Sequence, residues 1–577
     1  MRIAVATAPV DPVIRDDVDF SESSRRPVGA GLRVVLVGFQ DQDNLGLRYL
    51  QSAARHHGHD CRIVTYGSDA ERVATEVVAA EPAVVGLSLI FQYMAPQFGL
   101  LVGALRERGF SGHITMGGHY PSFDPGEVLN RIPGLDSVVC YEGELTFVEL
   151  LGFLERGLAW RHLHGLACRR SEVDPAIVVN EHRMSIEDLD ELPLPDRSDV
   201  DYERQELPTA SMLASRGCPW NCSFCSIRPF YEAPGGALRR LRRPEAVAAE
   251  MVELHRERGV VAFLFQDDDF MATGRRGRAW AVALAEAIGR SELAGRVSLK
   301  ISCRSDEVNE EAMRVLRDQG GLTHVYLGVE SGDPVTLEHL HKQLKPQAHI
   351  AAANVFRRLG MSFDFGYMIM EPYSTFQSVR GGIDFLDEFV GDGWTVATFC
   401  RTLPYAGTPI AKNLRAEGRL LGSPFDPDYH FLDERLDFFY DWMLHTFHRR
   451  NFTDVGLCHI LRGLQFELHL DVAGRRPATA TQQAMGRYLA SVANRTATHT
   501  LRTALEHCEA TTIEALQADP SLLLGLTEME RQAEERLERE TYAFYEEFRS
   551  TAIVDADDLP GGFKHTYTPD PVRASVG

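Results

Sequence analysis

Three cysteines stand close together in this sequence. Cys218, Cys222 and Cys225 occur in the segment SRGCPWNCSFCSIRPFY with a C-x3-C-x2-C spacing. Three thiolates on one short loop can hold three corners of an iron–sulfur cube. Such a cube keeps one iron open to a further ligand, as catalytic metal sites do. The alternative is a structural zinc ion, which requires a fourth Cys or His that no nearby segment supplies. The spacing therefore favours an iron–sulfur cluster with an open coordination position.

The elements that must position these cysteines form a repeating pattern. Six strand-like stretches, each followed by a helical pattern, read TASMLAS, VVAFLFQ, VSLKIS, HVYLGV, SFDFGYMIM and WTVATFC. The cysteines lie on the loop after the first of them. Six units are more than a simple open sheet needs and fewer than the eight of a closed barrel. We therefore expect a partial, TIM-type (β/α)6 barrel.

The cysteine spacing, the aromatic Phe224 before the third cysteine and the six units resemble the radical S-adenosylmethionine (SAM) superfamily. The resemblance implies that the three cysteines ligate a [4Fe-4S] cluster and that SAM chelates the fourth iron through its amino and carboxylate groups. It also implies cleavage of SAM to methionine and a 5′-deoxyadenosyl radical. Polar residues at the ends of the second, third and fourth strands stand where the superfamily contacts SAM. They are Gln266, Asp268, Ser302, Arg304, Glu330 and Ser331.

Residues 32–150 predict a second α/β unit. Strand-like LRVVLVGF, CRIVTYG, AVVGLSLI, HITMGG and DSVVCYEG alternate with helical patterns. Such alternation is typical of a doubly wound, flavodoxin-like (Rossmann-like) sheet, which binds ligands at the carboxyl ends of its strands. A unit of this kind ahead of a radical SAM barrel is similar to the cobalamin-dependent branch of the superfamily.

Cobalamin-binding domains with a histidine lower ligand carry D-x-H-x-x-G after the first strand. The corresponding stretch here runs from Asp41 to Gly46, with Asp43 in the place of the histidine. A carboxylate is a poor partner for cobalt, so the resemblance implies methylcobalamin bound without a histidine lower ligand. Two glycine-bearing turns are further candidates for cobalamin contacts, although each alone is also typical of any flavodoxin-like domain. Their residues are Gly117, Gly118, His119, Glu142, Gly143 and Thr146.

Composition and patterning divide this α/β chain into four segments. We expect a cobalamin-binding domain with an N-terminal extension over 1–165 and an acidic, proline-bearing linker over 166–205. The barrel follows over 206–415. Charged amphipathic patterns over 416–577 predict a mostly helical C-terminal domain, whose aromatic residues fit a helix core.

The charge balance restricts the partners of this 577-residue chain. It has 60 Lys+Arg and 82 Asp+Glu, a formal net charge of −22. Such an acidic surface disfavours nucleic acid and anionic membranes. We find no signal-peptide pattern and expect a cytoplasmic protein with a small-molecule substrate. A flavodoxin or ferredoxin could deliver the electron by docking on the basic run Arg239, Arg240, Arg242 and Arg243.

The resemblance implies a C-methyltransferase. In this interpretation a methyl group passes from methylcobalamin to an unactivated carbon of a natural-product intermediate, after the 5′-deoxyadenosyl radical has removed hydrogen from that carbon. Two alternatives stay open. One is a non-methylating B12-dependent radical SAM enzyme that contracts, cyclises or oxidises its substrate. The other is a non-catalytic cobalamin or iron–sulfur sensor.

Overall fold

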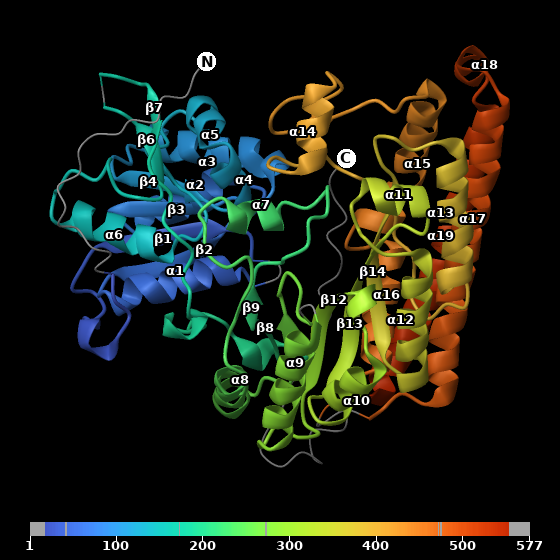
Figure 1. Ribbon diagram of the computed structural model, residues 1–577, viewed down its shortest axis with the longest axis horizontal. Helices are drawn as coiled ribbons and strands as arrows, with labels where there is room; N and C mark the ends of the chain where they lie inside the picture. Colours follow the sequence, from blue (N-terminus) through green and yellow to red (C-terminus); the bar gives the residue numbers. More distant parts are fainter. Residues whose placement is uncertain are drawn as a thin grey trace.

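The computed structural model describes residues 18–40, 43–171, 173–271, 274–470, 472 and 476–552. Three parts follow one another along the chain (Figure 1). The N-terminal sheet domain is blue to teal, the barrel is green to yellow, and the C-terminal helices are orange to red. Together they confirm the α/β fold with a partial barrel and a helical C-terminal region.

The N-terminal domain has a parallel sheet in the order β2-β1-β3-β4-β5. The order reverses between β1 and β3, which places a ligand-binding crevice at the carboxyl ends of these strands. Five of the six residues of β1 are buried, as expected for a strand covered on both faces. The strands are β1 (Arg33–Gly38), β2 (Asp60–Thr65), β3 (Val84–Ser88), β4 (His113–Gly117) and β5 (Ser137–Val139). The helices are α1 (Leu45–His56), α2 (Ala70–Ala79), α3 (Ala95–Glu107), α4 (His119–Phe123), α5 (Pro125–Arg131) and α6 (Glu144–Glu155).

The sheet continues into the segment that we expected to be linker. β6 (Leu166–Arg169) pairs antiparallel with β5, and β7 (Ile177–Val179) pairs antiparallel with β6. Both strands are too short to stand out in the sequence, but pairing satisfies their backbone groups at the sheet edge. The connecting segment therefore starts near residue 180, later than the expected 166. It contains the short 3-10 turns η3 (Leu189–Glu191) and η4 (Tyr202–Arg204).

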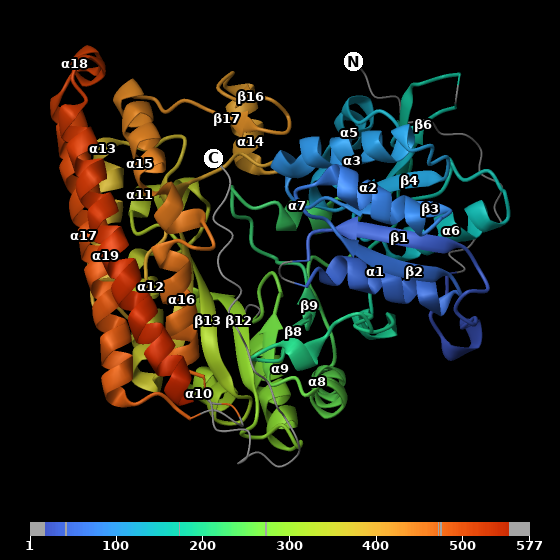
Figure 2. The ribbon, with the colours of Figure 1, turned by 180° about the vertical axis from the view of Figure 1, so that it is seen from behind.

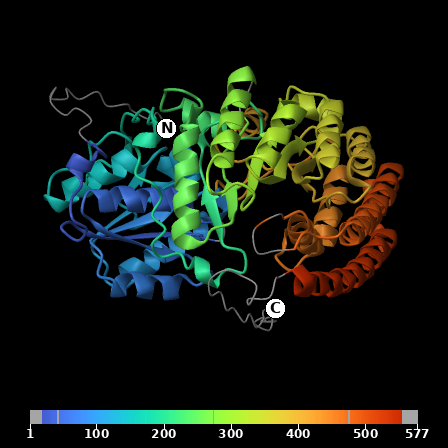
Figure 3. The same ribbon diagram turned by 90° about the horizontal axis from the view of Figure 1, so that it is seen from below.

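The barrel sheet has six parallel strands in the order β8-β11-β12-β13-β14-β15. This confirms the partial barrel. The strands are β8 (Thr209–Met212), β11 (Ala262–Phe265), β12 (Ser298–Arg304), β13 (Leu322–Glu330), β14 (Ser362–Met370) and β15 (Cys400–Arg401). The helices are α8 (Pro244–Arg258), α9 (Gly274–Gly289), α10 (Glu310–Asp318), α11 (Pro334–His339), α12 (Pro346–Leu359) and α13 (Phe376–Val390). Seen from below, the helices coloured from green to red form an arc (Figure 3).

The sixth strand is shorter than WTVATFC predicts, because only Cys400 and Arg401 pair with β14. The backbone before them bonds to side chains of the C-terminal helices instead. Ala397 N donates to Asn494 Oδ1 at 2.8 Å, and Ala397 O accepts from Arg450 Nη1 at 2.9 Å. These bonds replace the missing strand pairing.

The C-terminal region packs against the barrel as a helical layer, as expected. In the view from behind, the long helices α17 and α19 run side by side (Figure 2). Phe439 is fully buried and Trp442 nearly so, which confirms their place in a helix core. The helices are α14 (Pro409–Ala416), α15 (Glu434–Phe452), α16 (Leu457–Leu468), α17 (Ala480–Ala510), α18 (Ile513–Ala518) and α19 (Ser521–Ala552). A small hairpin, β16 (Leu421–Gly422) and β17 (Pro427–Asp428), follows α14.

Asn494→Ala should destabilise the protein. The buried Asn494 amide serves Ala397 N and two carbonyls, Val390 O at 2.7 Å and Thr395 O at 2.9 Å. Removing it leaves three buried backbone groups without their hydrogen-bond partner, and we expect a loss of about 3 kcal/mol in unfolding free energy. Urea unfolding measures this. The exposed Asn413→Ala on α14 is the control, with a change within about 0.5 kcal/mol. Equal effects of the two substitutions would contradict the bracing role.

Candidate functional site

The cysteine loop leaves the short strand β9 (Ser215–Arg216), which pairs antiparallel with β10 (Arg240–Leu241), and it ends at α7 (Ile227–Glu232). Gly217 begins it with φ +88°, and a Cβ there would lie 2.1 Å from Leu238 O. Only glycine fits this position. Gly217 N donates to Asp268 Oδ2 at 2.8 Å, which ties the loop to the end of β11. Burial raises the pKa of Asp268 to about 6.

The segment between the second and third cysteines is held at Ser223. Ser223 N donates to Leu340 O at 3.0 Å, and its hydroxyl donates to His339 O at 2.8 Å. Ser223 O accepts from Ile410 N at 2.9 Å, at the start of α14. The end of α11 and the start of α14 therefore fix this part of the loop.

Trp220, between the first two cysteines, packs under Arg304. The Arg304 guanidinium carbon lies 3.7 Å from the centre of a Trp220 ring, and Arg304 Nη1 lies 3.9 Å from Cys222 Sγ. Arg304 also donates to Lys342 O at 2.6 Å. Trp220 Nε1 donates to Glu307 Oε1 at 3.1 Å. The predicted Arg304 thus holds the loop, and Trp220 is a partner that the sequence reasoning missed.

Lys342 is a second missed residue. It is buried, and its ammonium lies 3.1 Å from Glu330 Oε1 and 6.0 Å from the Phe224 ring centre. Burial alone would lower its pKa, but Glu330 and Cys222 outweigh burial and raise it. Glu330 has φ +67°, an uncommon backbone conformation for a residue with a side chain. A rare lysine among only five in the chain was the available signal.

The three cysteines are free thiols and partly exposed. Burial raises the pKa of Cys225 to about 12 and raises the pKa values of Cys218 and Cys222 as well. Lys342 and Arg304 act in the opposite direction on Cys222. Among the described residues, no three His, Cys, Asp or Glu side chains converge on one metal-ion position. Binding of a metal to these thiols must release their protons.

A cavity of about 710 Å³ lies between the carboxyl ends of β1, β3 and β4 and the short strand β9. Three large side chains in its wall stay exposed: Ile90 at 45%, Phe91 at 43% and Tyr93 at 51%. Exposed apolar surface gathered in a cavity is typical of a ligand site. The cavity brings together predicted residues of both domains. They are Asp43, Gly46, Gly117, Gly118, His119, Glu142, Gly143, Gln266 and Asp268.

The end of β4 has no room for side chains. Gly118 has φ +111°, and a Cβ there would lie 2.2 Å from Leu89 O, while one at Gly117 would lie 3.2 Å from Val139 O. His119 follows, and its ring stacks on Phe230 of α7 at 4.1 Å between ring centres. Burial lowers the pKa of His119 to about 4, so its ring is neutral at pH 7. His119 therefore packs the N-terminal domain against the helix after the cysteines.

Several predicted residues lie elsewhere. Thr146 is fully buried and accepts from Arg183 Nε at 3.4 Å inside the N-terminal domain. Ser331 is buried, and its hydroxyl accepts from Asp333 N at 3.2 Å in the turn after β13. Asp41 lies outside the described residues. The remaining predicted residues lie outside the cavity lining, at the ends of β12 and β13 and on the cysteine loop. They are Ser302, Arg304, Glu330, Cys218, Cys222 and Cys225.

Glu142 lines the cavity and also pairs with two arginines. Its two oxygens each lie 2.8 Å from a guanidinium nitrogen, one of Arg216 and one of Arg240. Arg216 also lies 2.6 Å from Glu144. Burial alone would raise the pKa of Glu142, but the two arginines outweigh burial and lower it. This buried cluster clamps the N-terminal domain to the antiparallel pair of β9 and β10, between which the cysteine loop lies.

The prediction that the basic run docks an electron donor is wrong, because three of its four arginine side chains are buried. Side-chain exposure is 8% for Arg239, 3% for Arg240 and 4% for Arg242. These three pair with acidic residues of the barrel, the N-terminal domain and the linker. Only Arg243, at 74%, is exposed. The sequence shows their charge but not the acids that they meet after folding.

Comparison with known proteins identifies the two domains. Residues 32–151 match the B12 binding domain, and residues 212–378 match the radical SAM superfamily. An uncharacterised methyltransferase of Pyrococcus horikoshii is 30% identical over 386 residues, covering 65% of this chain and 79% of that protein. The chain belongs to the cobalamin-dependent radical SAM enzymes.

Two further likenesses fit this cobalamin-dependent radical SAM enzyme. The anaerobic magnesium-protoporphyrin IX monomethyl ester cyclase of Synechocystis is 30% identical over 266 residues, which cover 44% of this chain and 49% of that one. The solved structure of the cobalamin-dependent SAM radical enzyme OxsB, with aqua-cobalamin bound, matches with a TM-score of 0.65 and 15% identity. It covers 92% of this chain and 82% of OxsB, and this likeness concerns the fold.

The residues of this cobalamin-dependent radical SAM enzyme fit both cofactors. Three free thiols on one loop suit an iron–sulfur cluster, and two cations beside Cys222 suit its negative charge. The glycine edge at Gly117 and Gly118 and the uncovered patch at Ile90, Phe91 and Tyr93 suit a large, flat ligand. Within the described part of the chain, no helix is long and apolar enough to cross a membrane.

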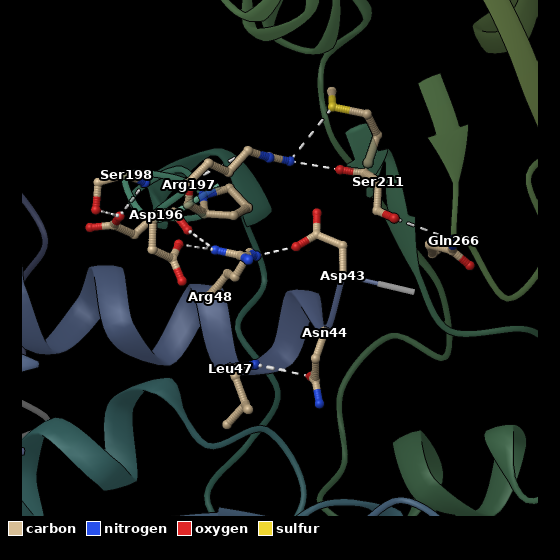
Figure 4. Close-up of polar contacts among 12 residues, drawn as sticks. Asp43, Asn44, Leu47, Arg48, Asp196, Arg197, Ser198, Ser211 and Gln266 are labelled. Atoms are coloured by element: carbon tan, nitrogen blue, oxygen red, sulfur yellow. Dashed lines mark hydrogen bonds and ion pairs between the residues drawn. The ribbon is translucent and has the colours of Figure 1, made fainter. Parts of the chain in front are cut away.

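Asp43 of the enzyme is tied to the linker. Its carboxylate pairs with Arg48, which lies 2.6 Å from Asp199 and donates to Asp196 O at 2.9 Å. Figure 4 shows the Arg48 guanidinium between Asp43 and the residues around Asp196. Asp43 also has φ +56°. The residue in the place of the expected histidine thus has a structural partner.

Glu142→Gln tests the clamp, because it removes the countercharge of Arg240 and leaves Arg216 paired with Glu144 alone. We expect a loss of about 3 kcal/mol in unfolding free energy at pH 7. The lowered pKa of Glu142 means that its contribution is present above the ordinary 4.5 and is lost as the pH falls through the lowered value. Urea unfolding at pH 7 and about pH 3 should show this difference shrinking. A pH-independent difference would contradict the ionic role. The matched control is Glu155→Gln, in a more exposed pair with Arg26, which should cost under about 1 kcal/mol.

Proposed function

We propose that this enzyme is a C-methyltransferase that methylates an unactivated carbon of a small-molecule natural-product intermediate. The observation that carries the proposal is the single cavity that joins the glycine edge of the N-terminal sheet to Gln266 and Asp268 of the barrel. A methyl donor and a radical source bound on these two sides would face one substrate. The relative from Pyrococcus horikoshii is named a methyltransferase, which supports methyl transfer.

The chain's own residues would provide the two cofactor sites. Cys218, Cys222 and Cys225 would ligate the [4Fe-4S] cluster, and Gln266, Asp268, Ser302, Arg304 and Glu330 are our candidates for SAM contacts. When bound, the cluster with SAM supplies a 5′-deoxyadenosyl radical and cobalamin supplies a methyl group. The protein holds the loop geometry through Gly217, Ser223 and Trp220 and thus orients these groups toward one carbon.

Aromatic side chains between the domains would exclude water from the reacting groups. Phe91 lies 5.7 Å from Tyr93 and 6.0 Å from Tyr405, measured between ring centres. Tyr405 follows β15 of the barrel, so this cluster reaches across the domain boundary. An apolar boundary protects a radical from wrong hydrogen donors and keeps electrostatic interactions strong.

We infer that cobalamin is bound here as methylcobalamin without a histidine lower ligand. The position of that histidine is occupied by Asp43, and Arg48 holds its carboxylate. His119 stacks on Phe230 and has a packing role of its own. Absence of a strong lower ligand favours the low-coordinate cobalt that suits methyl transfer.

Turnover products distinguish this proposal from its alternatives. Reconstituted enzyme with SAM, a reductant and the substrate should release S-adenosylhomocysteine and 5′-deoxyadenosine in equal amounts. The Cys218→Ala, Cys222→Ala, Cys225→Ala triple variant should lose iron, sulfide and SAM cleavage but keep cobalamin, because cobalamin is held by the other domain. Liquid chromatography and metal analysis measure these quantities. Full iron content in the triple variant would refute the cluster assignment.

The cyclase relative makes a non-methylating reaction the second candidate. In that case, 5′-deoxyadenosine forms without S-adenosylhomocysteine. A third outcome, no SAM cleavage by the reduced and reconstituted wild type, would instead indicate a sensor.

Asp43→Ala tests the inferred cobalt ligation. The electron paramagnetic resonance spectra of the cob(II)alamin-loaded wild type and of the variant should both lack nitrogen hyperfine splitting, because in our inference no nitrogen atom would ligate the lower side of cobalt. Cobalamin content should be unchanged by the substitution, because Asp43 serves Arg48. Nitrogen splitting in the wild type would overturn the inference.

A further inference from the structure

The face of the barrel sheet opposite its helices is polar. Along β12, β13 and β14, alternate residues such as Ile301, Leu327 and Phe365 are buried against the helices. The residues between them point to the other face and pair in register, with Lys300 beside His324, Tyr326 beside Asp364 and Gly328 beside Gly366. The cysteine loop lies at the carboxyl ends of these strands, where Arg304 approaches Cys222. The residues that this open face presents are Lys300, Ser302, His324, Tyr326, Gly328, Glu330, Asp364 and Gly366.

The upper part of this face is accessible. Tyr326 is 38% exposed, although it lies in the middle of a central strand. Gly366 makes room for it, because a Cβ there would lie 2.6 Å from the Tyr326 hydroxyl. The part below is covered by α16, where Phe466 packs edge-on against His324 at 5.5 Å between ring centres. The accessible part is therefore bounded below by α16 and above by the end of the strands.

Two cations stand at the lower boundary without full compensation. The structure gives the partly buried Lys300 ammonium no hydrogen bond or ion pair among the described residues. Arg462 comes from α16 and donates to Thr398 Oγ1, but its Nε is buried without a hydrogen-bond partner and lies 3.9 Å from Asp364. Asp364, which Arg462 approaches, pairs in register with Tyr326 across the sheet.

Within the described part of the chain, Asp364 is the acid that the structure pairs with Arg462, and it has other partners. It accepts from Thr395 Oγ1 at 3.1 Å and lies 3.2 Å from His324 Nε2. Burial lowers the pKa of His324, so this ring is neutral at pH 7. Lys300 and Arg462 together thus exceed Asp364 by one positive charge. A partly buried charge without a countercharge is costly, and a bound anion would remove that cost.

We propose that Lys300 and Arg462 bind an anionic group of the substrate, a carboxylate or a phosphate, while Tyr326 packs against the substrate body. The proposal deepens the proposed function by naming the substrate class. Lys300 lies four residues, about 13 Å along the strand, from Arg304 beside Cys222. An anionic group held at Lys300 would therefore lie within reach of the cysteine loop for a small-molecule substrate.

Isothermal titration of the full, reconstituted chain with inorganic phosphate and, separately, with succinate tests this. We expect wild type to bind one of these anions, and Lys300→Gln and Arg462→Gln each to weaken binding at least tenfold. Lys300→Arg keeps the charge and should stay within about threefold of wild type. Lys412→Gln, an exposed lysine on α14, is the matched control and should change nothing. Tighter binding of phosphate would assign a phosphate ester, and tighter binding of succinate a carboxylate.

The cobalamin absorption spectrum of each variant shows that it is folded and loaded. Because Lys300 and Arg462 lie on different elements, the two single variants test the site independently. Equal affinity of wild type and the double variant for both anions would overturn the proposal. Anion binding that depends on both cations, in an enzyme that releases no S-adenosylhomocysteine, would support the anion site and count against the proposed methyl transfer alone.

Discussion

Glu142 lies between the guanidinium groups of Arg216 and Arg240, and through it the N-terminal domain is held against the barrel. Burying these groups costs desolvation energy, which such clusters recover only with good geometry and complete hydrogen bonding. Glu144 and the ring of Tyr49, 4.8 Å from the Arg216 guanidinium carbon, complete the environment. Because Arg216 stands two residues before Cys218, the same cluster orients both the cavity wall and the cysteine loop. This set of charges therefore contributes to the relative position of the two candidate cofactor sites.

The loop that follows is held by contacts from four directions. Gly217 bonds to Asp268, which follows β11. Ser223 bonds to the end of α11 and to the start of α14. Trp220 packs against Arg304. A site built on such fixed supports needs little rearrangement when its ligands bind. The cations are also placed selectively. In a chain of net charge −22, Arg304 and Lys342 lie next to Cys222, where a thiolate-ligated cluster brings negative charge.

The sequence predicts well what depends on local pattern. The apolar runs of β1 and β3, the six barrel strands and the cysteine spacing all identify their elements, because a parallel strand buried on both faces needs a continuous apolar run. It predicts poorly what depends on distant partners. β15 is short because Asn494, nearly a hundred residues later, bonds the backbone at Ala397. Glu142 stands in a family-like turn, yet its partners are arginines 74 and 98 residues away. A charged residue shows its sign in the sequence, but not the group that neutralises it.

An incomplete barrel leaves two sheet edges, and the helices that close the second edge also limit the open face of the sheet. At β15 only two residues pair, and Asn494 and Arg450 satisfy the backbone before them. The layer that provides these side chains also provides α16, which covers the lower part of the open face and presents Arg462 to it. The matched radical SAM region ends at residue 378, before α16 begins. The matched region holds the cysteine loop together with Lys300, Tyr326 and Asp364, whereas α16 covers the lower part of the open face and adds Arg462. The extent of this face, and one of its two proposed anion-binding cations, therefore depend on helices outside the matched region, whereas the cysteine loop lies inside it.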